Sequence, residues 1–211
     1  MTVNLWSEAD HARDYLERKH RIPHLDEGYA ALLEFLPPGP RRVLDLGTGD
    51  GYLIALIRDV HADSTGVAVD FSAEMLDRAR GRFADTPAVE VIEHDLDQPL
   101  PAAWGDFDAV VSAFAIHHVV DDRKRALYRE VYDRLAPGGV FANLEHVASV
   151  TPELHDAFLY AIGSSPDQDD PSNKLADVAL QLGWLRDLGF EHVDCHWKWR
   201  EIALLGGVKP G

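Results

Sequence analysis

Short apolar runs alternate with stretches of helical periodicity along most of the chain. The first forty residues predict two helices, one over Ser7–His20 and a second through Tyr29 and Leu36, before Pro37-Pro38-Gly39-Pro40 interrupts the pattern. Buried strands are then expected at 43–46, 65–69, 89–94, 107–112 and 140–147. Helical patterns run through Ile54, after Ser72, whose side chain is expected to cap its helix, and after Asp121. Alternating strands and helices predict an α/β fold with a doubly wound, mainly parallel sheet and helices on both faces.

The pattern changes after residue 147. A helix is expected from Thr151, then a mobile acidic loop at 164–173, and then a helical face from Leu175 to Leu185 that ends at Gly189. Two closing strands, at 192–198 and 202–208, lie too close together in the sequence for a crossover helix. They are therefore expected to pair antiparallel within the same single domain.

The stretch VLDLGTGDG, residues 43–51, places three glycines where the first strand ends and a helix begins. Ligands of such sheets bind beyond the carboxyl ends of the strands, so glycines here are expected to let the backbone approach a ligand. The spacing is G-x-G-x-G rather than the G-x-G-x-x-G of dinucleotide sites. Asp45 and Asp50 beside the turn would oppose a pyrophosphate and suit a ligand that carries a cationic group.

Two further aspartates follow the next strands. Asp70 can accept hydrogen bonds from both hydroxyls of a ribose, and Asp95 can accept one from an adenine amino group or, alternatively, cap its own turn. Leu96 or Met75 would cover the adenine ring. These residue types favour an adenosine without phosphate that carries a positive amino-acid tail, as in S-adenosylmethionine.

The same segments resemble the motifs of the class I S-adenosylmethionine-dependent methyltransferases. They are VLDLGTGDG, GVAVDFSAEML, EHDLDQPLP, FDAVVSAFAIHHV and LAPGGVFANLEHV, in order over residues 40 to 150. The resemblance implies a seven-stranded sheet with an antiparallel last strand, and Ala113 beneath the sulfonium. The expected cofactor-binding residues are Arg21, Asp45, Gly47, Thr48, Gly49, Asp70, Phe71, Met75, Asp95, Leu96 and Ala113.

Both ends of the chain resemble relatives of carboxy-S-adenosylmethionine synthase. The stretches are His20-Arg21-Ile22-Pro23 and WKWREIALLGGVKP, and the resemblance implies that Arg21 helps to cover the cofactor. A synthase-like activity of this kind is one alternative. The expected organisation is a helical lid at 1–40, a cofactor-binding core at 41–150, an acceptor-side insertion at 151–190 and a β-hairpin at 191–211.

Candidate catalytic residues lie at the ends of the fourth and fifth strands. His118, Glu145 and His146 are the groups best placed to orient or deprotonate a small organic acceptor, bound between the lid and the insertion. The alternative is that these side chains are structural. Methyl transfer depends mainly on holding donor and acceptor in line, so a base is needed only for a protonated acceptor.

The net charge and the cysteine content indicate which binding partners and metal sites are to be expected. Acidic residues outnumber Lys and Arg by 36 to 20, a net charge of −16 that disfavours nucleic acid and therefore an RNA-modifying enzyme. The single cysteine, Cys195, leaves no disulfide or cysteine-based zinc cluster, and no metal is expected. No signal peptide or membrane span is expected, which suits a cytoplasmic monomer or homodimer. A dinucleotide oxidoreductase and a non-catalytic adenosine-binding protein compete with the methyltransferase hypothesis.

Overall fold

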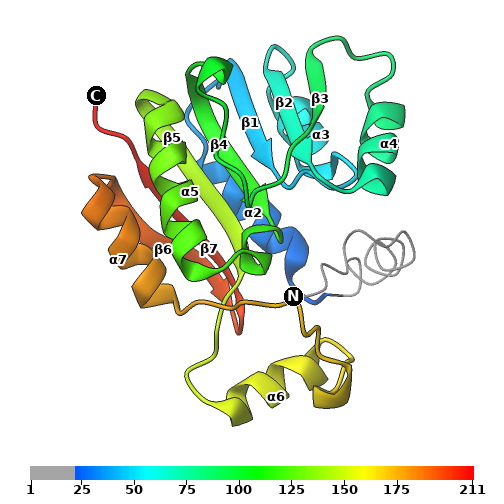
Figure 1. The fold of residues 1–211 in the computed structure, drawn as a ribbon, viewed down its shortest axis with the longest axis vertical. Coiled ribbons are helices and arrows are strands. Elements are labelled where there is room, and N and C mark those ends of the chain that lie inside the picture. The colour runs from blue at the N-terminus through cyan, green and yellow to red at the C-terminus, as the bar shows by residue number, and fades with distance from the viewer. Residues whose placement is uncertain (1–21) are drawn as a thin grey trace.

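In a computed structural model that describes residues 22–211, seven strands form one sheet in the order β3-β2-β1-β4-β5-β7-β6 (Figure 1). Strands β1 to β5 pair in parallel along this order, and β7 runs antiparallel to both of its neighbours. The predicted α/β sheet with an antiparallel last strand is confirmed. The strands are β1 Arg42–Leu46, β2 Thr65–Asp70, β3 Val89–Glu93, β4 Phe107–Ala113, β5 Leu135–His146, β6 Glu191–Trp199 and β7 Ile202–Val208.

Helices cover both faces of the sheet. Successive strand residues point to opposite faces: Leu44 packs in a cluster with α5 and α7, whereas Val43 packs in a cluster with α2 and α3. Figure 1 shows α6 apart from these layers, beyond one end of the sheet. The helices are α2 Leu25–Phe35, α3 Tyr52–Val60, α4 Ala73–Arg82, α5 Asp121–Arg134, α6 Pro152–Ala161 and α7 Val178–Leu188.

The order of the strands reverses at β1, whose neighbours are β2 and β4. Crossovers on opposite faces leave a crevice where such an order reverses, at the carboxyl ends of the strands. The glycine turn 47–51 lies at this point, directly after β1. The topology therefore places a crevice where the sequence predicts a binding site.

The segment between β5 and α7 leaves the sheet and returns to the same place. Ala148 N donates a hydrogen bond to Ala176 O at 3.1 Å, so the two ends of the segment 149–175 lie side by side. Within it, Thr151 caps α6 by accepting a hydrogen bond from Leu154 N at 3.4 Å, in agreement with the predicted start of that helix. We call residues 149–175 the acceptor segment.

Several local predictions need correction. Ser72 precedes α4, but its hydroxyl makes no capping hydrogen bond; its backbone N–H binds Asp70 instead. Helix α7 begins after Asp177, whose carboxylate accepts hydrogen bonds from the first turn, so Leu175 lies outside the helix. The loop 164–173 is partly packed, because Ser172 is buried.

Two further predictions concern the ends of the molecule. The helix predicted over Ser7–His20 lies outside the described residues, as does Arg21. Helix α2, the part of the expected lid that the structure describes, packs on the core through the buried side chains of Leu25, Tyr29 and Leu32, and the role of a lid stays a prediction. Among the helices of residues 22–211, none combines the length and apolar character needed to cross a membrane.

Candidate functional site

A cavity opens at the carboxyl ends of β1, β2 and β4. It brings together all the expected cofactor-binding residues that the structure describes. Tyr29 of α2 and Tyr52 of α3 also line it, as do His118, Ser172 and Lys174. The expected residues in the cavity wall are Asp45, Gly47, Thr48, Gly49, Asp70, Phe71, Met75, Asp95, Leu96 and Ala113.

The three glycines of the turn have different roles. Gly47 has φ +68°, and a Cβ at this position would lie 2.1 Å from the Cβ of Ala115. Gly51 has φ +79°, and a Cβ there would lie 2.5 Å from the ring of Phe83. Both glycines are therefore required by the packing of the protein against itself. Gly47 also lines the cavity whereas Gly51 does not, and the role of the turn in approaching a ligand stays a prediction. Gly49 is the glycine whose surroundings stay open, since a Cβ built there would lie 4.0 Å from its nearest neighbour, Met75 Sδ.

Asp45 is buried at the end of β1 with one oxygen unsatisfied. Thr48 Oγ1 donates a hydrogen bond to Asp45 Oδ2 at 2.6 Å, whereas Oδ1 is buried without a hydrogen-bond partner among residues 22–211. Burial raises the pKa of Asp45 to about 7, against the opposing effect of the Thr48 hydrogen bond. An unsatisfied buried carboxylate oxygen is costly, and a ligand ammonium group would satisfy it.

Asp70, at the end of β2, holds the glycine turn in place. Its Oδ2 accepts a hydrogen bond from Gly49 N and its Oδ1 one from Ser72 N, each at 2.9 Å. Burial raises the pKa of Asp70, while these backbone hydrogen bonds lower it. Each carboxylate oxygen can accept a second hydrogen bond, so ribose hydroxyls could still bind here. The ribose-binding role stays a prediction, and the clamp on the turn is an additional role.

The expected adenine-binding residues lie on two sides of the glycine turn. Asp95 Oδ1 accepts a hydrogen bond from Asp97 N at 2.9 Å, so this aspartate does cap its own turn. Met75 and Leu96 are buried against the turn, on the Gly49 side and the Gly47 side respectively. Their positions suit an apolar ring between them, and binding of adenine by Asp95 stays a prediction.

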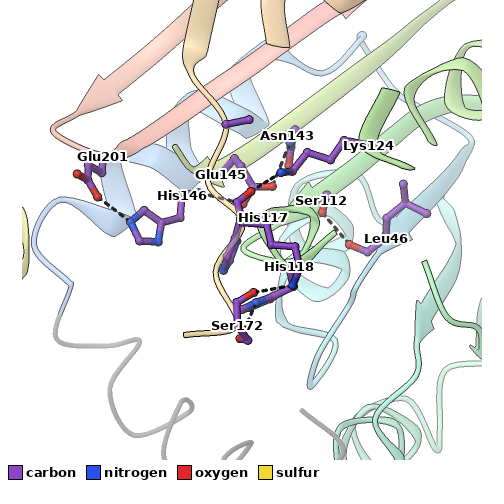
Figure 2. Close-up of polar contacts among 12 residues, drawn as sticks. Leu46, Ser112, His117, His118, Lys124, Asn143, Glu145, His146, Ser172 and Glu201 are labelled. Carbon is purple, nitrogen blue, oxygen red and sulfur yellow. Dashed lines mark hydrogen bonds and ion pairs between the residues drawn. The ribbon is translucent and has the colours of Figure 1, made fainter. Parts of the chain in front are cut away.

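His118 is the expected catalytic residue that the structure places in the cavity wall. Its Nδ1 lies 3.1 Å from Ser172 Oγ, within the acceptor segment (Figure 2). Burial, and to a smaller extent the neighbouring His117, lower the pKa of His118 to about 3, so the ring is neutral at pH 7. A ring with so low a pKa is a weak base, but it can orient an acceptor molecule through a hydrogen bond.

Glu145 does not reach the cavity, contrary to the expectation for it. It follows Phe141 and Asn143 at alternate positions of β5, and this face of the sheet is covered by α5 and α7. Its Oε1 lies 2.6 Å from His117 Nδ1, and its Oε2 accepts a hydrogen bond from Asn143 Nδ2 at 3.4 Å. Burial raises the pKa of Glu145 to about 7. The contacts support a structural role for Glu145.

His146 also lies away from the cavity, and Figure 2 shows it directed toward Glu201. His146 Nε2 lies 2.9 Å from Glu201 Oε2, and His155 Nδ1 of α6 lies 3.0 Å from the same oxygen. His155 Nε2 lies 3.2 Å from Asp169 Oδ2. This chain of contacts ties the acceptor segment to the sheet edge, which corrects the catalytic expectation for His146. Within residues 22–211, no group of three or more His, Cys, Asp or Glu side chains is arranged to hold a metal ion.

Ser172 and Lys174 are cavity residues that sequence reasoning missed. Both lie in or next to the loop expected to be mobile and unpacked, more than fifty residues after His118 in the sequence. Lys174 N donates a hydrogen bond to His117 O at 2.8 Å, which fixes this part of the segment against the end of β4. No periodic pattern or turn signal marks such a long-range contact.

Comparison with known proteins agrees with the geometry. Residues 43–139 match the profile of a family described as the methyltransferase domain. An uncharacterized methyltransferase of Mycobacterium bovis is 40% identical over 129 residues, which make up 61% of this chain and 61% of that protein. A demethylmenaquinone methyltransferase of Clavibacter sepedonicus is 31% identical over 191 residues, covering 82% of this chain and 76% of the relative.

The fold is shared with solved structures over nearly the whole chain. An O-methyltransferase family protein from Burkholderia thailandensis superposes with a TM-score of 0.74 at 20% identity, covering 98% of this chain and 62% of that one. At this level of identity the likeness concerns the fold alone. The chain spans about three fifths of the length of the mycobacterial relative, since the matched region covers 61% of that protein.

Proposed function

Because the chain belongs to the class I S-adenosylmethionine-dependent methyltransferases, we propose that it transfers a methyl group from this cofactor to a small organic molecule. The observation that carries the proposal is the cavity that joins the expected cofactor residues to His118, Ser172 and Lys174. The acceptor would bind at the end formed by these three residues. Donor and acceptor would then meet near Ala113, which also lines the cavity.

The residues present fit the cofactor of this family. S-adenosylmethionine supplies a methyl group already activated on a sulfonium. Asp45 Oδ1, buried and without a partner among the described residues, would accept a hydrogen bond from the ammonium of the methionine part. Asp70 would bind the ribose, and Met75, Asp95 and Leu96 would hold the adenine. Arg21, outside the described residues, stays a predicted cover of the site.

A small acceptor is favoured by the shape and charge of the chain. Ser172 and Lys174 of the acceptor segment line the cavity, so the site is a concave pocket rather than a flat surface. The net charge of −16 opposes a nucleic acid. The name of the Clavibacter relative, a demethylmenaquinone methyltransferase, is that of an enzyme with a small organic acceptor. The methylated atom is left open, and a synthase-like reaction and cofactor binding without catalysis compete with this proposal.

The affinity for S-adenosylhomocysteine, the product of the cofactor, should depend on pH through the protonation state of Asp45. At acid pH the carboxyl is protonated, because its pKa is raised to about 7, and a ligand ammonium must displace that proton. We expect the affinity for S-adenosylhomocysteine to rise by up to about tenfold per pH unit between roughly pH 5 and 7, and then to level off. Calorimetry across this range measures it. Asp45→Asn should bind more weakly and without this slope; an equal slope in the variant would contradict the assignment.

His118 should affect turnover more than cofactor binding. We expect His118→Ala to lower the rate of methyl transfer by about 2- to 13-fold, because the imidazole would orient the acceptor through one neutral hydrogen bond, worth about 0.5–1.5 kcal/mol. A ring with a pKa of about 3 is too weak a base at pH 7 for a larger general-base effect. The affinity for S-adenosylhomocysteine should change less than twofold or so, since His118 is outside the adenosine-binding group. His61→Ala, at the end of α3 and outside the cavity wall, is the control.

The assay needs an acceptor found by screening small molecules with isotope-labelled S-adenosylmethionine. Thermal shift with S-adenosylhomocysteine and with NAD tests the class of cofactor beforehand, since ligand at about 100 times its dissociation constant adds roughly 2.7 kcal/mol of stability. A shift with NAD alone would overturn the proposed function. Cofactor binding without transfer to any screened acceptor would favour a non-catalytic role. An unchanged rate in His118→Ala would make this side chain structural.

A further inference from the structure

We propose that Lys174 binds an anionic group of the acceptor, so that the preferred acceptors are carboxylates; this inference rests on the proposed function. Lys174 lines the same end of the cavity as His118 and Ser172. Its ammonium group would pair with the carboxylate while the atom to be methylated faces the cofactor. The residue would then determine specificity without taking part in the transfer itself.

The backbone of Lys174 is held in place on both sides. Its N–H donates to His117 O at 2.8 Å, and its carbonyl accepts a hydrogen bond from Lys124 Nζ. Lys124 is itself buried and pairs with Asp121 Oδ1 at 2.9 Å. A buried lysine is costly to maintain, so its use to fix this carbonyl gives the segment a defined position. The ammonium of Lys174 is thus presented from a fixed backbone.

That ammonium makes no ion pair within the described part of the chain. Lys174 Nζ donates to Ser172 O at 3.1 Å, but no salt bridge joins it to a carboxylate of residues 22–211. By contrast, Arg82 pairs with Asp50 and Arg123 pairs with Glu130. An ammonium has three donors, so hydrogen-bonding capacity is left over for a ligand. A cavity cation that has no carboxylate partner among residues 22–211 points to an anionic ligand.

The charges along the cavity would orient such an acceptor. Lys174 is the only lysine or arginine among the described residues that line it. His118 cannot substitute for it, because burial keeps that ring neutral. The cofactor end carries five aspartates and would repel a carboxylate. Near Lys174 an acidic side chain is also present, since Asp170 Oδ1 accepts a hydrogen bond from Ser172 N at 2.8 Å, but the five aspartates make the Lys174 end the more favourable position. The acidic residues of the lining are Asp45, Asp50, Asp70, Asp95 and Asp97.

The test uses matched pairs of ligands on the full chain saturated with S-adenosylhomocysteine. The probes are aromatic and aliphatic carboxylic acids of increasing size, each paired with its primary amide, and calorimetry or ligand-observed NMR measures their affinities. We expect at least one acid to bind about 10- to 150-fold more tightly than its amide, the range of a charge-assisted hydrogen bond. Lys174→Met should abolish the preference, and Lys174→Arg should retain most of it.

Lys198→Met is the matched control, since Lys198 is an exposed lysine of β6 outside the cavity wall. It should keep the preference of the parent protein. A parent protein that prefers no acid across the series, or a Lys174→Met variant that keeps the preference, would overturn the inference. Both outcomes leave the proposed function standing provided that S-adenosylhomocysteine binds. Failure of S-adenosylhomocysteine to bind the parent protein would instead remove the proposed function.

Discussion

Gly47→Ala is expected to lower the free energy of unfolding by about 2–5 kcal/mol. The left-handed backbone at φ +68° disfavours any side chain, and the new Cβ would lie 2.1 Å from the Cβ of Ala115. Because Ala115 Cβ is the start of a side chain rather than its flexible end, the backbone after β4 must shift. Urea unfolding followed by circular dichroism measures the change. Cofactor affinity should fall as well, since both segments line the cavity.

Gly138→Ala separates the cost of the left-handed backbone from the cost of the contact with Ala115. Gly138 also has a positive φ, +77°, but a Cβ there would have no atom within 4 Å. This variant should lose only the backbone contribution, about 1–2 kcal/mol. Equal losses in the two variants would show that contact with Ala115 is unimportant and would contradict the explanation given for Gly47.

Asp70→Asn is expected to weaken S-adenosylhomocysteine binding by about 10- to 150-fold, as calorimetry would measure. The amide keeps the shape of the side chain but removes the charge that strengthens hydrogen bonds from ribose hydroxyls, worth about 1.5–3 kcal/mol. It also leaves one of two backbone donors, Gly49 N or Ser72 N, without an acceptor. The free energy of unfolding should therefore fall by about 1–3 kcal/mol in the same variant.

Asp77→Asn provides the comparison for Asp70. Asp77 is an exposed residue of α4 that pairs with Arg80 at 3.2 Å and does not line the cavity. Surface pairs of this kind contribute about 0–1 kcal/mol, so stability and affinity should both stay near those of the parent protein. If Asp70→Asn bound as tightly as Asp77→Asn, Asp70 would serve the fold alone.

The parts of the molecule that follow from local sequence were predictable. Strand β1 is an apolar run, the turn after it has its own glycine spacing, and the short connection between β6 and β7 leaves no room for a crossover. Each of these signals lies within a few residues of the structure that it specifies. The aspartates at the ends of β1 and β2 follow from the same logic, because parallel strands end at a common edge.

The residues at the acceptor end of the cavity could not be predicted from any short stretch of the sequence. Glu145 follows a strand, as a catalytic residue would, but the two-residue period of β5 turns it toward α5 and α7. His146 is engaged by Glu201, a residue fifty-five positions away. Lys174 reaches the cavity through a hydrogen bond to His117. Tertiary contacts between distant segments decide which of these residues reach the cavity. Residues so far apart in the sequence give no local signal of such contacts.

The acceptor segment could be replaced by a segment of different length and sequence. Its ends meet at the hydrogen bond between Ala148 and Ala176, and its other attachments, such as the contact of His155 with Glu201 and the burial of Phe158, are made mainly by side chains of the segment itself. The entropy of closing a loop grows only slowly with its length, and each doubling costs about 0.6 kcal/mol. Segments of quite different length and composition could therefore be grafted between β5 and α7 without disturbing the strands that hold the glycine turn. Chains of this architecture can thus diversify in what they recognise while the cofactor half stays as it is.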